Sequence, residues 1–233
     1  MKTSIDATER LAVASGQSVA RADAEAVAQT IALWEADEAR RRQAMRSSGV
    51  ARPEQVAGLT GMQVFAAMFA GELPYPPINE TLDFMLIEVE FGRAVLQGRP
   101  MLRHYNPLGT VHGGWIATLL DSSVGCAVHS TMPIGKAYTT AEIKVNFVRP
   151  VTTHVPLLRA IGTVIHGGSR MATAEGRLVG PDGKLYAHAS TTCFIFDAAQ
   201  GNVALPLPSH PTGDERREAA PLGLSELSTP KEI

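Results

Sequence analysis

The sequence of 233 residues lacks the features that mark several large classes of protein. Its formal net charge is only -2, which gives no indication of a general affinity for nucleic acid. It has only two cysteines, Cys126 and Cys193, which lie in apolar runs without a CxxC spacing and suit a reducing compartment. No run is apolar for long enough to span a bilayer, and no signal-peptide pattern is found. We therefore expect a soluble, cytoplasmic protein without a membrane or nucleic-acid partner.

Metal-binding spacings are also missing from the sequence. Five histidines show neither an HExxH pattern nor paired cysteines nearby: His129, His154, His166, His188 and His210. Structural or surface roles are the default for such side chains. We predict no metal site.

The first 72 residues precede the predicted core. Residues 1–50 are expected to form a helical extension that is partly disordered, because residues 1–16 are small and polar. From Ser18 to about Arg46, apolar residues recur at steps of three and four, which predicts a helix. Residues 51–72 form a lead-in with a second short helix from Thr60 to Ala70, which Thr60 caps.

One domain, residues 73–197, is predicted to contain the core. It has two short strands, a long central helix from about Gly114 to Ser130, and then a meander of four strands. An apolar helix beside an antiparallel sheet is buried if the sheet curls around it, so the fold class is α+β. Residues 198–233 are rich in proline without periodicity and are predicted to be a flexible tail. The expected strands are Met85–Phe91, Ala94–Gln97, 140–147, Leu157–Ile165, Arg170–Val179 and Leu185–Phe196.

The central helix carries a charge in apolar surroundings. Between Arg103 and Lys136, Asp121 is the only formally charged side chain, where a solvated helix face would normally carry several charges. Gly113 and Gly114 open the helix, and the free amides of a helix start receive negative charge. One segment therefore offers an oxyanion site and a lone carboxylate, a combination that indicates acyl-transfer chemistry.

The spacing of these two groups requires a second chain. Gly113 and Asp121 are eight residues apart, which is about 12 Å along a helix. A catalytic carboxylate and an oxyanion donor must both lie within about 3 Å of the reacting carbonyl group. Two antiparallel helices meet this requirement, so we expect a two-fold dimer with two shared sites. Small and polar residues that allow close approach share one face of the helix: Gly114, Thr118, Asp121, Ser122, Gly125 and His129.

Several of these residues together form a recognisable pattern. Asn106, Gly109, the triplet His112-Gly113-Gly114 and Asp121 resemble the signature of hotdog-fold acyl-CoA thioesterases of the phenylacetate-degradation (PaaI) type, in the 4-hydroxybenzoyl-CoA thioesterase superfamily. The resemblance extends from about Leu73 to Phe196. It implies a hotdog fold, in which a curved antiparallel sheet wraps around one long helix. It also implies a homodimer, commonly paired into a dimer of dimers, and no cofactor, because coenzyme A is part of the substrate.

The resemblance implies a role for each residue of the pattern. Asp121 attacks the thioester or activates the water that does, and the Gly113 N–H faces the thioester oxygen. His112 either polarises the carbonyl group or anchors the loop. Asn106 either holds the carbonyl or the water, or it bonds its own loop backbone.

Further residues are assigned to the water and to coenzyme A. Thr140 occupies the strand position at which related proteins carry a serine or threonine that positions the water, with Thr139 as the competing candidate. The phosphates of coenzyme A need cationic or amide-rich surroundings. We expect Arg149 and the turn at Gly168, Ser169 and Arg170 to provide them.

The predicted function is hydrolysis of an acyl-CoA thioester to a free acid and coenzyme A. One alternative is a non-catalytic module that binds or senses acyl-CoA, although the intact Asp121 argues against it. The other is a hydratase or dehydratase, which the same fold also supports. Such an enzyme is expected to place an aspartate and a histidine together near a helix start. Trp115, Ile116 and Phe147 are expected to line the acyl pocket, whose specificity stays open.

Overall fold

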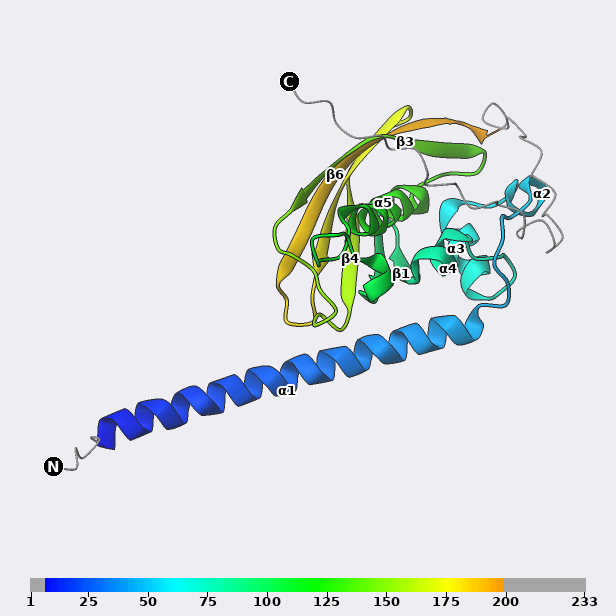
Figure 1. Cartoon of the computed structure of the whole chain (residues 1–233). Helices are drawn as coiled ribbons and strands as arrows, with labels where there is room; N and C mark the ends of the chain where they lie inside the picture. Colours follow the sequence, from blue (N-terminus) through cyan, green and yellow to red (C-terminus); the bar gives the residue numbers. More distant parts are fainter. Residues whose placement is uncertain (1–6, 199–233) are drawn as a thin grey trace, which may run out of the picture. The chain divides into compact units, whose positions relative to one another are not determined.

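The computed structural model describes residues 7–198, with side chains from residue 21 onward (Figure 1). Residues 1–6 and the predicted tail from residue 199 onward lie outside the described residues. Within that range, no helix has both the length and the apolar character needed to cross a membrane. In chain order the elements are α1 (Ala7–Ala44), α2 (Pro53–Val56), α3 (Gly61–Phe69), α4 (Ile78–Leu82), β1 (Phe84–Glu90), β2 (Arg93–Gly98), the 3-10 helix η1 (Leu102–His104), α5 (Gly113–Ser130), β3 (Lys136–Phe147), β4 (Leu158–Gly167), β5 (Met171–Val179) and β6 (Leu185–Asp197).

The strands form one antiparallel sheet in the order β1-β2-β4-β5-β6-β3. Helix α5 packs against every strand of this sheet, and Figure 1 shows the sheet curving around it. Leu119, Leu120 and Val124 of α5 are each 0% exposed. Burial of one such side chain contributes about 1.5–3 kcal/mol, so the helix and the concave face of the sheet form the core. The predicted α+β hotdog fold with an additional N-terminal helix is confirmed.

The predicted meander of four strands is wrong for its first strand. Strands β4, β5 and β6 are consecutive neighbours, but β3 pairs with β6 at the edge of the sheet, with Thr140 opposite Cys193. On its other side β4 pairs with β2. The alternation of residues in a strand reveals which side chains share a face, but it contains no information about the neighbouring strand. The segment between β3 and β4 crosses from one part of the sheet to another.

Glycines of the sheet allow α5 to approach it closely. A Cβ atom at Gly162 of β4 would overlap the carbonyl group of Ser123 and lie 2.7 Å from the backbone nitrogen of Val124. A Cβ at Gly98 of β2 would lie 2.8 Å from the ring of Trp115. Both contacts are closer than side chains normally tolerate, so the backbone of α5 rests directly on the sheet.

Helix α1 is longer than predicted, because it begins at Ala7 and includes residues expected to be disordered. Its C-terminal half is joined to β2 and β4 by Gln97, which is 1% exposed. The Gln97 amide donates to the carbonyl oxygen of Trp34 at 3.1 Å and to Glu38 at 2.9 Å, and it accepts from Arg159 at 2.9 Å. Side chains alternate along a strand, so Gln97 lies on the face of β2 opposite to Gly98, which faces α5. Helix α1 therefore packs on the outer face of the sheet.

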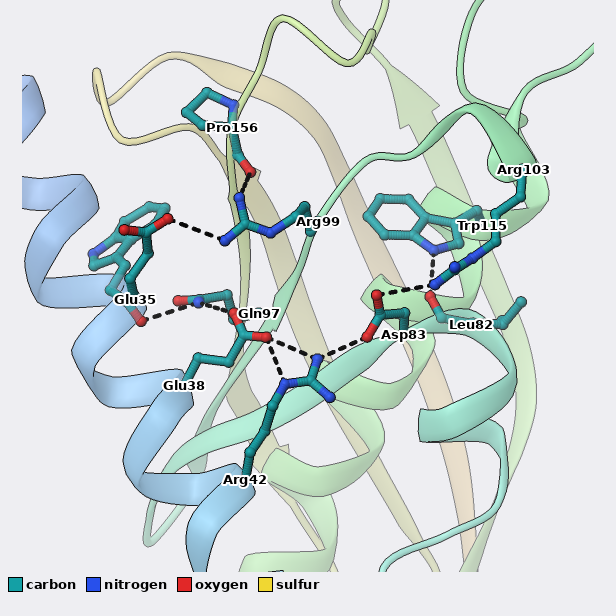
Figure 2. Close-up of polar contacts among 11 residues, drawn as sticks. Glu35, Glu38, Arg42, Leu82, Asp83, Gln97, Arg99, Arg103, Trp115 and Pro156 are labelled. Atoms are coloured by element: carbon teal, nitrogen blue, oxygen red, sulfur yellow. Dashed lines mark hydrogen bonds and ion pairs between the residues drawn. The ribbon is translucent and has the colours of Figure 1, made fainter.

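Ion pairs extend this contact along α1. Arg42 pairs with Glu38 and with Asp83, each at 2.7 Å, and Arg103 reaches the same Asp83 at 3.0 Å (Figure 2). Asp83 directly follows α4, and Arg103 belongs to η1. The network therefore connects α1 with the segments that precede and follow the hairpin of β1 and β2.

Helix α3 confirms the predicted second helix. The Thr60 hydroxyl accepts a hydrogen bond from the N–H of Gln63 at 3.3 Å, and Gly71 follows the helix with a φ of 76°. The first residue, Gly61, donates its N–H to the carbonyl of Met132 at 2.9 Å. A Cβ at this position would overlap the carbonyl of His129. The start of α3 is therefore held against the end of α5.

We predict that Gly162→Ala destabilises the protein by about 1–3 kcal/mol or more, because the new methyl group collides with the backbone of α5. Gly167→Ala in the same strand is the matched control, since nothing lies within 4 Å of its Cβ position. The free energy of unfolding from urea titrations measures both effects. A Gly162→Ala protein as stable as the control would contradict the close contact.

Candidate active site

The start of α5 presents an open hydrogen-bond donor. His112 caps the helix, because its Nδ1 accepts the N–H of Gly114 at 2.8 Å. The N–H of His112 itself donates to the carbonyl of His104 at 2.7 Å. Within residues 7–198, the Gly113 N–H donates to no other residue. The positive end of the helix dipole favours an anion at this amide.

The geometry of His112 matches the anchoring role among its two predicted roles. With Nδ1 accepting from Gly114, the ring proton belongs on Nε2. The second predicted role, polarising a carbonyl group, would therefore require the N–H at Nε2 as the donor.

Asn106 is engaged with its own loop. Its Oδ1 accepts from the N–H groups of Leu108 at 2.9 Å and Thr110 at 3.3 Å, and its Nδ2 donates to the Thr110 hydroxyl at 3.0 Å. Of the two predicted alternatives for Asn106, this arrangement is the one in which the side chain bonds its own loop. The other was binding of the carbonyl group or the water. The turn closes through Gly109, whose φ of 82° is strained for other residues.

A cavity of about 350 Å³ adjoins the start of α5 and is called here the helix-start cavity. It lies where the loop after η1 meets the end of β3, so the predicted oxyanion donor faces an open space. Its lining includes Asn106, Gly113, Ile116, Phe147 and Arg149.

Asp121 faces a different cavity, of about 340 Å³, called here the carboxylate cavity. The Thr140 hydroxyl donates to Oδ1 of Asp121 at 3.2 Å, whereas the neighbouring Thr139 is exposed. Burial raises the pKa of Asp121, because a low-dielectric environment disfavours the charged form, and the Thr140 hydrogen bond partly opposes this effect. The carboxylate is therefore a stronger base than an exposed aspartate. Thr140, rather than Thr139, is the threonine in contact with it.

One chain does not bring the carboxylate and the oxyanion donor together. The helix-start cavity and the carboxylate cavity share no lining residue. Gly113 and Asp121 belong to the same continuous helix, and eight residues of helix span about 12 Å. Each chain therefore holds Asp121 and the Gly113 amide in two separate cavities.

The residues predicted to bind coenzyme A also lie apart within one chain. Arg149 lines the helix-start cavity, just beyond the end of β3. The turn at Gly168, Ser169 and Arg170 is exposed and lies at the other end of the sheet, where Met171 pairs with Phe194. The Gly168 N–H donates to the carbonyl of Met171 at 2.9 Å, so this amide closes the turn.

Trp115 corrects one expectation about the acyl pocket. It lines neither cavity, whereas Ile116 and Phe147 do line the helix-start cavity. The Trp115 ring is buried, donates to the carbonyl of Leu82 at 2.8 Å and stacks on His104 at a centroid distance of 5.0 Å. One helix position turns the side chain by about 100°, which moves Trp115 from the face of Gly114 toward the sheet.

Four polar residues that line the carboxylate cavity were not among the predicted site residues: Asn79, Ser122, His129 and Tyr138. His129 follows Asp121 and Gly125 at steps of four, so the helical period contained a signal for it. Asn79 lies in α4 and Tyr138 in β3, and nothing in their local sequence predicts that they meet α5.

Comparisons with known proteins agree with this fold. Residues 108–187 match the family model described as the thioesterase superfamily. A protein of Saccharolobus solfataricus named "Putative esterase" is 31% identical over 118 residues, which are 51% of this chain and 82% of that protein. The chain belongs to the thioesterase superfamily, which supports thioester hydrolysis as its general reaction.

Two solved structures illustrate the similarity. A Ralstonia eutropha protein, named as a "putative thioesterase" related to phenylacetic acid degradation, has a TM-score of 0.52 and 30% identity over 56% of this chain and 98% of that one. The PaaI protein of E. coli has a TM-score of 0.50 and 21% identity over 58% of this chain and 93% of that one. The second shows the shared fold alone.

We predict that Thr140→Val raises the pKa of Asp121 further. The Thr140 hydroxyl stabilises the ionised carboxylate, so its removal favours the protonated form and moves the titration to higher pH. A carbon-detected NMR titration of the aspartate carboxyl groups measures the shift. Thr139→Val, at the exposed neighbouring position, should leave it unchanged, and equal titrations of all three proteins would rule out the contact.

Proposed function

We propose that the protein hydrolyses an acyl-CoA thioester to a free carboxylic acid and coenzyme A. Asp121 acts as base or nucleophile, and the N–H of Gly113 of the partner subunit receives the oxyanion. The observation that carries this proposal is the lone carboxylate of Asp121, which has a raised pKa and faces a largely apolar cavity. Such a carboxylate is suited to accept a proton or to attack a carbonyl carbon.

Both forms of the reaction give the same products. As a base, Asp121 takes a proton from a water molecule whose oxygen attacks the thioester carbon. Negative charge then develops on the carbonyl oxygen, where an amide at a helix start stabilises it. When the carbon–sulfur bond breaks, the coenzyme A sulfur leaves and is protonated. As a nucleophile, Asp121 forms an anhydride with the acyl group, and water then hydrolyses it.

The edge strand β3 supports a two-fold dimer. Within the described sheet β3 pairs only with β6, so its other edge has no strand beside it. Phe147 and Val148 at its end are 55% and 49% exposed. An edge strand with an unpaired side is a template for pairing with another strand.

Antiparallel pairing of two β3 strands would bring the carboxylate cavity of one chain to the helix-start cavity of the partner subunit. Thr140, near one end of β3, contacts Asp121, and Phe147, at the other end, lies 3.0 Å from the Cβ position of Gly113. A two-fold axis midway between these two positions places Thr140 of one chain opposite Phe147 of the partner subunit. Asp121 then faces Gly113 of the partner subunit, as the spacing along α5 requires.

The same pairing gives the coenzyme A residues a common location. It brings the end of the sheet that carries Ser169 and Arg170 toward the end of the partner subunit that carries Arg149. We propose that these side chains, from two chains, hold the phosphates of coenzyme A by charge-assisted hydrogen bonds.

We predict that Asp121→Asn lowers the rate of thiol release by about 100- to 10,000-fold, because the proton acceptor is lost. The pKa of Asp121 is higher in the folded chain than in the unfolded chain. The free energy of unfolding therefore falls as the pH rises from the pKa of the unfolded state to that of the folded state. The asparagine removes this effect, and the melting temperature at neutral pH should be equal or higher. Full thiol release by the variant would refute the role of Asp121.

A mixed dimer tests whether the site is shared. Gly113→Pro removes the N–H at the first helical position, where proline is well tolerated, and the preceding His112 has the extended backbone that proline requires. Asp121→Asn and Gly113→Pro should each be inactive alone. Refolded together in equal amounts, they should regain about a quarter of the wild-type activity, because half of the dimers have one intact site.

A site within one chain gives a different result in the same experiment. Every chain in the mixture then lacks either the carboxylate or the amide, and no activity returns. Co-purification of a tagged Asp121→Asn chain with an untagged Gly113→Pro chain is the control that mixed dimers form.

A further inference from the structure

One aspartate outside both cavities bridges two arginines from different parts of the chain. Oδ1 of Asp83 pairs with Arg42 of α1 at 2.7 Å, and Oδ2 pairs with Arg103 of η1 at 3.0 Å (Figure 2). The Asp83 side chain is only 20% exposed. None of these three residues lines the carboxylate cavity or the helix-start cavity. The proposed reaction therefore makes no direct use of this cluster, which is called here the Asp83 bridge.

The backbone of Asp83 has an unusual conformation. With a φ of 52°, Asp83 is the only residue other than glycine that has a positive φ between positions 7 and 198. Aspartate and asparagine adopt this left-handed conformation more readily than most residues, and glycine adopts it without strain. A carboxylate at a position that glycine would occupy more easily points to a function for its charge.

The segment that Arg103 connects to Asp83 also fixes the start of α5. His104 is the next residue, and its carbonyl oxygen accepts the N–H of His112 at 2.7 Å. His112 in turn caps α5 by accepting the N–H of Gly114 at 2.8 Å. Gly113 lies between these two fixed groups, so the direction of its N–H depends on the position of η1.

A second contact closes this connection. The indole N–H of Trp115, in the first turn of α5, donates to the carbonyl oxygen of Leu82 at 2.8 Å. The indole ring stacks on His104 at a centroid distance of 5.0 Å. Leu82 directly precedes Asp83. The end of α4, η1 and the start of α5 therefore form a closed ring of contacts, and Asp83 supplies the negative charge in it (Figure 2).

The charge of Asp83 keeps two like-charged groups close together. Arg42 and Arg103 each have a guanidinium nitrogen within 3.0 Å of the same carboxylate, and without it the two cations repel each other. An amide in place of the carboxylate offers one acceptor oxygen and one donor nitrogen, so it can hold only one of the two arginines in this geometry. In that case η1 loses its connection to α1, and the His104 carbonyl is free to move.

We propose that Asp83 is a positioning residue for the oxyanion donor. By holding Arg103 against Arg42 it fixes η1, the cap of α5 and thereby the direction of the Gly113 N–H. This inference rests on the proposed function, which gives that N–H its role. All three residues of the Asp83 bridge precede residue 108, at which the match to the thioesterase family begins. Segments that precede the matched region therefore contribute to the reactivity of the site.

Amide hydrogen exchange of Asp83→Asn, followed by NMR, tests the inference without a substrate. Asparagine suits the left-handed backbone, so the variant removes the charge and keeps the local conformation. The His112 N–H should exchange about tenfold faster or more, because η1 opens locally and releases its hydrogen bond to His104. Arg42→Met, which removes the other end of the bridge, should accelerate the same amide at least about threefold. Unchanged exchange of His112 in either variant overturns the inference.

Asp37→Asn is the matched control. The Asp37 carboxylate also pairs with two arginines, Arg40 of α1 and Arg159 of β4, the latter at 2.7 Å. It therefore joins α1 to the sheet as Asp83 does, but its partners lie in α1 and β4 and not in η1. Whatever this variant does to the melting temperature, it should change the exchange of His112 by less than about twofold. An acceleration equal to that in Asp83→Asn would show a general loosening of α1 and overturn the inference.

Steady-state kinetics give the second readout. The substrate is whichever of acetyl-CoA, hexanoyl-CoA and phenylacetyl-CoA the wild-type protein hydrolyses fastest. An oxyanion donor acts mainly in the transition state, so Asp83→Asn should lower kcat about fivefold or more while KM changes less than about twofold. Asp37→Asn should retain the wild-type kcat. A raised KM at full kcat would assign Asp83 to substrate binding and would contradict the positioning role.

The two readouts separate this inference from the proposed function. Faster exchange of His112 with an unchanged kcat overturns the positioning role of Asp83 and leaves thioester hydrolysis intact. If the wild-type protein hydrolyses no acyl-CoA, the proposed function fails. The exchange rates of His112 then still support or overturn the connection between the Asp83 bridge and the start of α5.

Discussion

The contact between α5 and the concave face of the sheet is the constraint on which the rest of the structure depends. Gly162 allows the backbone of α5 to rest on β4, and the apolar side chains Leu119, Leu120 and Val124 fill the space between them. A helix packed this closely has few positions for charged groups, because ionised side chains are costly to bury. The single carboxylate of Asp121 is tolerated where the helix meets a cavity, and there burial makes it a better base.

The central helix also keeps the Gly113 amide and the Asp121 carboxylate apart. Gly113 and Asp121 belong to one continuous helix, so the amide terminus and the carboxylate stay about 12 Å apart. The outer face of the sheet near β2 is covered by α1 through Gln97, while among residues 7–198 no strand pairs with the outer edge of β3. This distribution leaves one part of the sheet available to a second chain, and it is the part that carries Thr140.

Sequence reasoning was most successful where the period of the residues carried the information. The positions of α3, α5 and most strands followed from the spacing of apolar residues. It failed for the pairing of β3 and for Trp115, which turned toward Leu82 and His104. Both depend on contacts between residues far apart in the chain, about which a local pattern contains no information.

The sequence by itself determined the α+β class, the lone carboxylate in an apolar helix, and the spacing that separates it from Gly113. These are properties of neighbours along the chain, and helical geometry converts them into distances. Only the tertiary structure decided that Asn106 bonds its own loop and that Asn79 and Tyr138 meet His129 around one cavity. Asn79, Tyr138 and His129 come from α4, β3 and α5, and the burial of α5 in the sheet brings them together.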